Sequence, residues 1–242
     1  MNTTARSPAG LTWLRGAAIA ALLTLPASVL VVRLGWWQPG LLLYAAACLV
    51  SVAALALAVI AGLLPRLRRH RGALLTPVLA ALPGSVLLAT VLAGRGDHPP
   101  IHDISTDLTR PPVFSHAPAL RGREANSLEP NPQTHAAQRA AYADIQPLRS
   151  SLAPEAAYAR AVTTAEQLGW EVVYQAPRKG ELEAVATTPI MGFKDDVAIR
   201  LRPSGDGGTR VDLRSVSRVG VGDLGANAAR IRAFIEQYSQ GE

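Results

Sequence analysis

Three glycines near the C-terminus have the spacing of a dinucleotide-binding loop, Gly220-x-Gly222-x-x-Gly225. Such a loop joins a strand of a parallel sheet to a helix, and an acidic residue about 20 positions later binds the ribose. The chain ends at residue 242, 17 residues after Gly225, and this remainder predicts one helix and a short tail. We therefore predict that the loop binds no nucleotide and that the protein holds no cofactor.

The N-terminus of the helix predicted after this loop is a candidate anion-binding site, because free N–H groups at a helix N-terminus bind anions. Arg218, Asn227 and Arg230 are near enough in sequence to contribute to such an anion site. Asp223, however, stands at the cap position, where its own carboxylate accepts hydrogen bonds from the same N–H groups. The sequence favours this self-capped helix, with the glycines at positive φ.

Two adjacent carboxylates, Asp195 and Asp196, begin a predicted strand. Neighbouring side chains of a strand point to opposite faces, so these two do not line one site without a bulge. Asp195 is in phase with apolar positions and needs a cationic partner, for which Arg214 and Arg218 are the candidates. A structural ion pair is the favoured interpretation and a ligand site is the alternative. We predict no metal site.

Further titratable groups gather in a Pro-rich stretch, at His98, His102, His116, Asp97, Asp103 and Asp107. Their spacing matches no metal-binding pattern of a helix or hairpin. Ser215 or Ser217, with His102 and Asp103, would supply the groups of a hydrolytic triad, but no nucleophile-elbow sequence surrounds either serine. We predict no catalytic residue and define a candidate cluster, ligand-binding or structural, as His102, Asp103, Asp195, Asp196, Arg214, Ser215, Arg218, Asp223, Asn227 and Arg230.

The charges divide the chain into two parts. Residues 1–94 contain seven arginines and no acidic residue, whereas residues 95–242 contain 18 acidic and 17 basic residues. The net charge of +6 is therefore +7 from the first part and −1 from the second. Because the polar part is near neutral, it lacks the basic surface that nucleic acids require, and we exclude nucleic acid as a partner.

Three segments of the first part, about 11–32, 41–64 and 73–94, are long and apolar enough to cross a bilayer. Four arginines in the loop RLRRHRG place that loop in the cytoplasm by the positive-inside rule. The N-terminus is then cytoplasmic and the C-terminal domain periplasmic, in a bacterial inner membrane. A cleaved signal peptide is the alternative for the first segment. No ionisable residue lies in the middle of a segment, which favours an anchor, residues 1–94, over a transport pathway.

The remainder predicts an α+β domain, residues 133–242, preceded by a Pro-rich extended segment, residues 95–132, that is partly packed on it. Apolar residues at helical spacing predict two main helices, one starting at Pro154 and one carrying Leu224 to Tyr238. Alternating residues predict an antiparallel sheet of about four strands, near 170–176, 182–186, 197–201 and 211–215. The fold class is thus a membrane-anchored α+β protein, with three transmembrane helices before a two-layer domain.

The last two predicted strands have a specific register. If Leu201 faces Val211, then Arg200 lies opposite Asp212 on the solvent-facing side, a favourable cross-strand pair. The same register places Arg202 beside Arg210 at a small cost. In the last helix, Arg232 and Glu236 are spaced to pair across one turn.

Four stretches of the chain resemble the bacterial domain of unknown function 1499 family: PPIHDISTD…PPVF, QRAAYADIQPL, GFKDDVAIRLR and VDLRSVSRVGVGDLGANAARIRAF. They cover roughly residues 98–239. The resemblance implies a membrane-linked domain that includes the IHDISTD segment. It implies no activity, cofactor or catalytic residue.

Three functions remain open from the sequence. The leading hypothesis is a binding or envelope-scaffold module, held in the lipid bilayer, whose partner is an envelope protein or a lipid. The second is an envelope hydrolase that uses the Asp, Arg and Ser residues of the candidate cluster. The third is a structural membrane protein that assembles into homo-oligomers.

Overall fold

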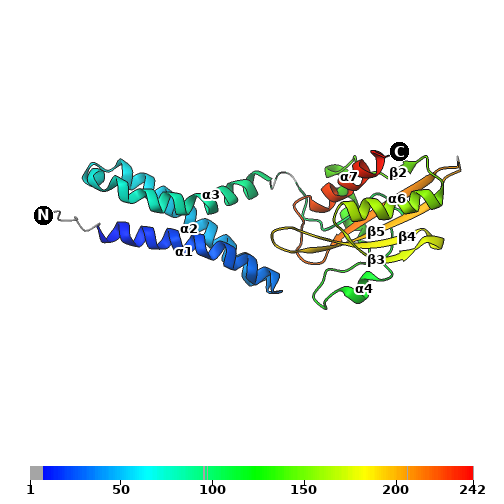
Figure 1. The fold of residues 1–242 in the computed structure, drawn as a ribbon, viewed down its shortest axis with the longest axis horizontal. Coiled ribbons are helices and arrows are strands. Elements are labelled where there is room, and N and C mark those ends of the chain that lie inside the picture. The colour runs from blue at the N-terminus through cyan, green and yellow to red at the C-terminus, as the bar shows by residue number, and fades with distance from the viewer. Residues whose placement is uncertain (1–7, 95, 97, 206, 242) are drawn as a thin grey trace. The chain divides into compact units, whose positions relative to one another are not determined.

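The computed structural model describes residues 8–94, 96, 98–205 and 207–241. The chain forms two compact units, Met1–Gly96 and Asp97–Glu242 (Figure 1). Of the residues singled out above, Asp97 lies outside the described residues.

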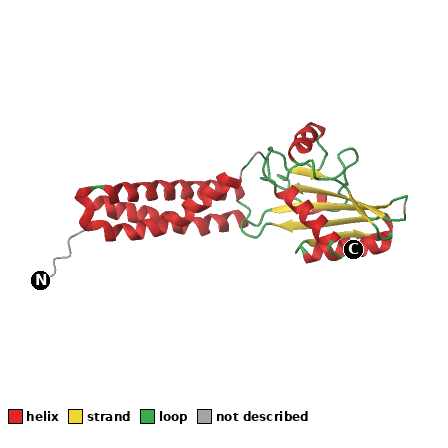
Figure 2. Ribbon diagram, turned by 90° about the horizontal axis from the view of Figure 1, so that it is seen from above, coloured by secondary structure: helices red, strands yellow, loops and turns green. Residues whose placement is uncertain are grey.

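The first unit contains three long α-helices, α1 (Ala9–Arg33), α2 (Trp37–Leu63) and α3 (Leu75–Gly94), which run side by side (Figure 2). A 3-10 helix, η1 (Pro65–Leu74), carries the arginine-rich loop between α2 and α3. Three helical spans are long and apolar enough to cross a membrane, as the sequence predicts. Small residues allow close contact between these helices, since a Cβ atom on Gly84 would collide with the Ser51 side chain.

The second unit is built on a six-stranded antiparallel sheet. The four predicted strands are present as β3 (Glu171–Ala176), β4 (Glu181–Thr187), β5 (Lys194–Pro203) and β6 (Thr209–Ser217). The prediction of about four strands was too low, because β1 (Asp103–Ser105) and β2 (Leu148–Ser150) also pair with β6. The spatial order is β1-β6-β5-β4-β3, with β2 beside β1 on the same edge of β6.

Helices α6 (Pro154–Gln167) and α7 (Ala226–Ser239) cover one face of the sheet, which we call the helix face (Figure 1). Its core is apolar and includes Leu213, Ile231 and Phe234, each fully buried. Leu224 was wrongly placed in the stripe of α7: it precedes the helix, has a φ of 52° and is 55% exposed. The remaining short helices are α4 (Ala117–Leu120), η2 (Pro132–Thr134), α5 (His135–Ala141) and η3 (Pro177–Lys179).

The predicted register of β5 and β6 is confirmed, with Leu201 opposite Val211 and Arg200 opposite Asp212. The prediction that this charged side faces solvent is wrong, because Asp212 is fully buried. The segment between β1 and α5 crosses it, and Phe114 and Ala117 pack there against β5 and β6. We call this second side of the sheet the ionic face. Alternation reveals which residues share a face, but not which distant segment covers that face.

Candidate functional site

The ionic face holds a network of arginines and aspartates at the end of β5 and the start of β6. Asp212 accepts hydrogen bonds from Arg200, Arg202 and Arg210, each at 2.9 Å. Asp107, from the covering segment, lies 3.1 to 3.6 Å from the same three guanidinium groups. Burial acts to raise the pKa of Asp212, but the three arginine hydrogen bonds outweigh it and hold this pKa below its ordinary value.

Arg214 continues the network along β6. Its guanidinium is fully buried and donates to Asp103 at 2.7 and 3.0 Å, and to the carbonyls of Pro112 and Leu128. The same group lies over the Phe114 ring, 5.4 Å from its centroid. Two of the predicted cluster residues, Asp103 and Arg214, therefore fasten the covering segment to the sheet.

Asp196 and Glu183 bind other parts of the segment between β1 and α5 that covers the ionic face. Asp196 is fully buried and pairs with Arg218 at 2.7 Å and with Arg121 at 3.0 Å. Burial lowers the pKa of Arg121, an effect that the adjacent Asp196 opposes. Glu183 accepts hydrogen bonds from the backbone N–H groups of Ser115, His116 and Ala117 at the start of α4. Both carboxylates thus have structural partners.

The other cluster residues lie on the helix face. Asp195 pairs with Arg230 of α7, so the expectation of Arg214 or Arg218 as its partner is wrong. Arg214 is an even-numbered position of β6 and Arg218 directly follows the strand in the same phase, so both side chains lie on the opposite side of the sheet, where Arg218 pairs with Asp196. Ser215 donates to the Asn227 side-chain oxygen at 2.6 Å and accepts from Arg230 at 3.0 Å. This buried network joins α7 to the sheet.

The Asp223 carboxylate accepts hydrogen bonds at the start of α7, as the self-capping interpretation predicts, but the cap position itself is Gly225, two residues after Asp223. The Asp223 carboxylate accepts hydrogen bonds from the backbone N–H groups of Gly225 at 2.9 Å and Asn227 at 2.7 Å. Gly220 and Gly225 have φ angles of 90° and 84°, which favour glycine. The His98 ring also occupies the space that a side chain on Gly225 would need.

The sheet therefore divides the predicted cluster instead of gathering it. Asp103, Asp196, Arg214 and Arg218 lie on the ionic face, and the other members lie on the helix face or at its end. The His102 ring hydrogen-bonds the Val221 carbonyl at 3.2 Å, whereas the hydroxyl groups of Ser215 and Ser217 both hydrogen-bond the Asn227 side chain. Among the same residues there is no group of three or more metal-ligating side chains.

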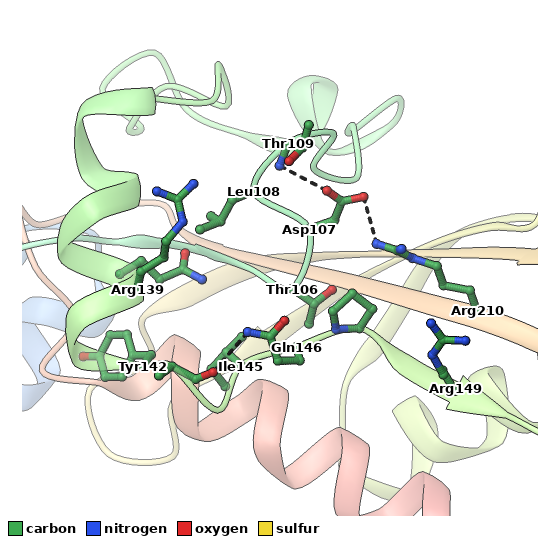
Figure 3. Close-up of a pocket in the computed structure, with 13 residues that line it drawn as sticks. Thr106, Asp107, Leu108, Thr109, Arg139, Tyr142, Ile145, Gln146, Arg149 and Arg210 are labelled. Carbon is green, nitrogen blue, oxygen red and sulfur yellow. Dashed lines mark hydrogen bonds and ion pairs between the residues drawn. The ribbon is translucent and has the colours of Figure 1, made fainter.

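A cavity of about 520 Å³ lies beside the ionic network (Figure 3). It forms where β1 and β2 pair with different parts of β6, because the chain leaves the sheet between them. Thr106 fills the gap in the ladder by exchanging hydrogen bonds with Leu213. The cavity walls include Asp107, Arg139, Tyr142, Gln146, Arg149 and Arg210.

Arginines dominate the charge of this cavity. Arg139 of α5 lies on one side of it, and Arg149 of β2 and Arg210 of β6 lie on the other (Figure 3). Sequence reasoning missed these three residues as a group. The predicted register placed Arg210 beside Arg202. No strand was predicted at 148–150, so the sequence did not indicate that Arg149 lies directly opposite Arg210. A cavity of this size is within the range of small-molecule sites.

The fold and the cavity define an α+β domain that follows apolar helices able to span a membrane. A family model described as a protein of unknown function, DUF1499, matches residues 103–238, so the chain belongs to that family. The match starts at β1 and ends in α7, and thus includes the segment that covers the ionic face. The comparison with curated proteins gives no match.

Proposed function

We propose that the protein is an integral inner-membrane protein whose α+β domain binds a ligand on the periplasmic side. The observation that supports this role best is the open, arginine-lined cavity next to a sheet made rigid by buried ion pairs. A rigid frame holds a binding site in one geometry and so lowers the entropic cost of binding.

The proposed orientation rests on the four arginines of η1, Arg66, Arg68, Arg69 and Arg71, all of which are exposed. A cytoplasmic η1 puts the end of α3 and the following domain on the other side of the membrane. A periplasm-dependent reporter fused after residue 242 tests this arrangement. We expect it to be active, and activity of a cytoplasm-dependent reporter at the same position would contradict the proposal.

The hydrolase and self-assembly alternatives have less support. The aspartates, arginines and serine that a hydrolase would use are held in ion pairs on two faces of the sheet, so they do not converge on one reacting atom. Self-assembly predicts a stable oligomer of the full chain in detergent, which light scattering would detect.

A thermal-shift series on the full chain in detergent tests the binding function directly. The series contains phosphate esters, carboxylates, nucleotides, sugars and divalent metals. A ligand at about 100 times its dissociation constant stabilises the native state by about 2.7 kcal/mol, which is several degrees for a domain of this size. We expect at least one class to raise the melting temperature. No shift with any class would contradict a small-ligand function.

A further inference from the structure

Three arginines stand in a row across three neighbouring strands. Arg149 of β2 is directly opposite Arg210 of β6, and Arg210 is directly opposite Arg202 of β5. Side chains of directly opposed residues lie on the same face with their Cβ atoms about 5 Å apart, and like charges in this position destabilise a sheet. Such a row needs negative charge beside it.

The protein supplies that charge to only part of the row. Arg202 and Arg210 both form ion pairs with Asp107 and Asp212. Arg200 forms ion pairs with the same two aspartates. The guanidinium group of Arg149 has no hydrogen bond or ion pair within residues 98–205 and 207–241, and the same is true of the guanidinium group of Arg139 across the cavity. The lining thus contains three arginines against a single aspartate, Asp107, an excess of two positive charges.

We propose that this cavity binds a phosphomonoester group, with Arg139 and Arg149 as its principal ligands and Arg210 beside them. The inference rests on the proposed binding function and names the chemistry of the ligand. A phosphomonoester carries nearly two negative charges at neutral pH, which matches the excess on the lining. Its three terminal oxygens accept hydrogen bonds from several guanidinium forks at once.

The size of the cavity indicates how large the ligand is beyond its phosphate group. A volume of about 520 Å³ is much larger than a phosphate group, so the site accommodates an organic portion as well. Thr109 and Gln146 line the space and offer polar contacts to that portion. A soluble phosphate ester and the headgroup of a phosphatidic acid share this chemistry, and the experiment separates these two sources.

The test uses the full chain in phosphatidylcholine nanodiscs and in a buffer free of phosphate. Calorimetry with glycerol 3-phosphate measures the soluble source, and co-sedimentation with phosphatidylcholine vesicles containing phosphatidic acid measures the lipid source. Tricarballylate, a carboxylate that carries at least as much negative charge, is the chemical control. The variants are Arg139→Gln and Arg149→Gln, and the matched control is Arg123→Gln, which removes an exposed arginine outside the cavity.

We expect at least one phosphomonoester source to bind, each cavity variant to weaken binding about tenfold or more, and the control to change it less than about twofold. Both cavity arginines are exposed, so the variants should not lower the melting temperature of the unliganded protein. Binding that survives both substitutions overturns the site assignment, and the absence of binding by both sources overturns the proposal. Equal binding of tricarballylate overturns the phosphomonoester class but leaves the proposed binding function intact.

Discussion

The two faces of the sheet are held by different forces. The helix face buries apolar side chains from β4, β5, β6, α6 and α7, which interact without strict geometry. The ionic face buries Asp196, Asp212 and Arg214, whose desolvation is offset only while each has its partner in place. Substitutions on the two faces should therefore lower the free energy of unfolding by different amounts. A small loss on the helix face leaves a void, whereas loss of one charge on the ionic face leaves other charges unpaired.

The largest expected effect is that of Asp212→Asn. This substitution keeps the shape of the side chain but removes the charge that holds Arg200, Arg202 and Arg210 together. Breaking a buried ion pair on one side typically costs about 3–5 kcal/mol. Urea unfolding of the full chain in detergent should show a destabilisation of that order. A change below about 1 kcal/mol would show that the ionic face is not required for stability.

Acid should weaken the same face in the wild-type protein. The pKa of Asp212 is lower in the folded state than in the unfolded chain, so its contribution is complete above the unfolded value of about 3.9. That contribution is lost as the pH falls below about 4 through the lower pKa of the folded state. Unfolding measured between about pH 5 and pH 2 should be less pH-dependent in Asp212→Asn than in the wild type. Equal pH dependence would contradict this assignment.

A conservative change on the helix face should cost less. Ile231→Val removes one methylene from a fully buried position of α7, and such a substitution typically costs about 0.5–1.5 kcal/mol. The same urea experiment measures it. A loss as large as that of Asp212→Asn would remove the contrast between the two faces.

The smallest effect is expected for Asp144→Ala. Asp144 pairs with Arg232, and this pair replaces the predicted Arg232–Glu236 contact. The hydrogen bonds from Arg232 are the largest cause of a lowered pKa at Asp144, but both side chains are about half exposed. Solvent and salt screen such a pair, so we expect a loss of less than about 1 kcal/mol that shrinks further at high salt. Melting temperatures at two salt concentrations would detect this difference.

Sequence reasoning succeeded where the pattern was local. The alternation of Val197, Ile199 and Leu201 identified β5, and the turn after it set the register with β6. It failed for β1 and β2, since a strand of three residues has too few positions to alternate and each is stabilised by the edge of β6. The partner of Asp195 was misassigned for a similar reason, because Arg230 is 35 residues away on a helix.

The amino-acid sequence by itself determined the three apolar spans, the α+β class of the domain, the self-capped glycine loop and the opposite directions of Asp195 and Asp196. Each follows from periodicity or from neighbours within a few residues. Only the tertiary structure decided which arginine meets which carboxylate, what covers the ionic face, and that Arg139, Arg149 and Arg210 line one cavity. Most of these contacts join residues from different elements of the fold, and their geometry depends on how the intervening elements pack.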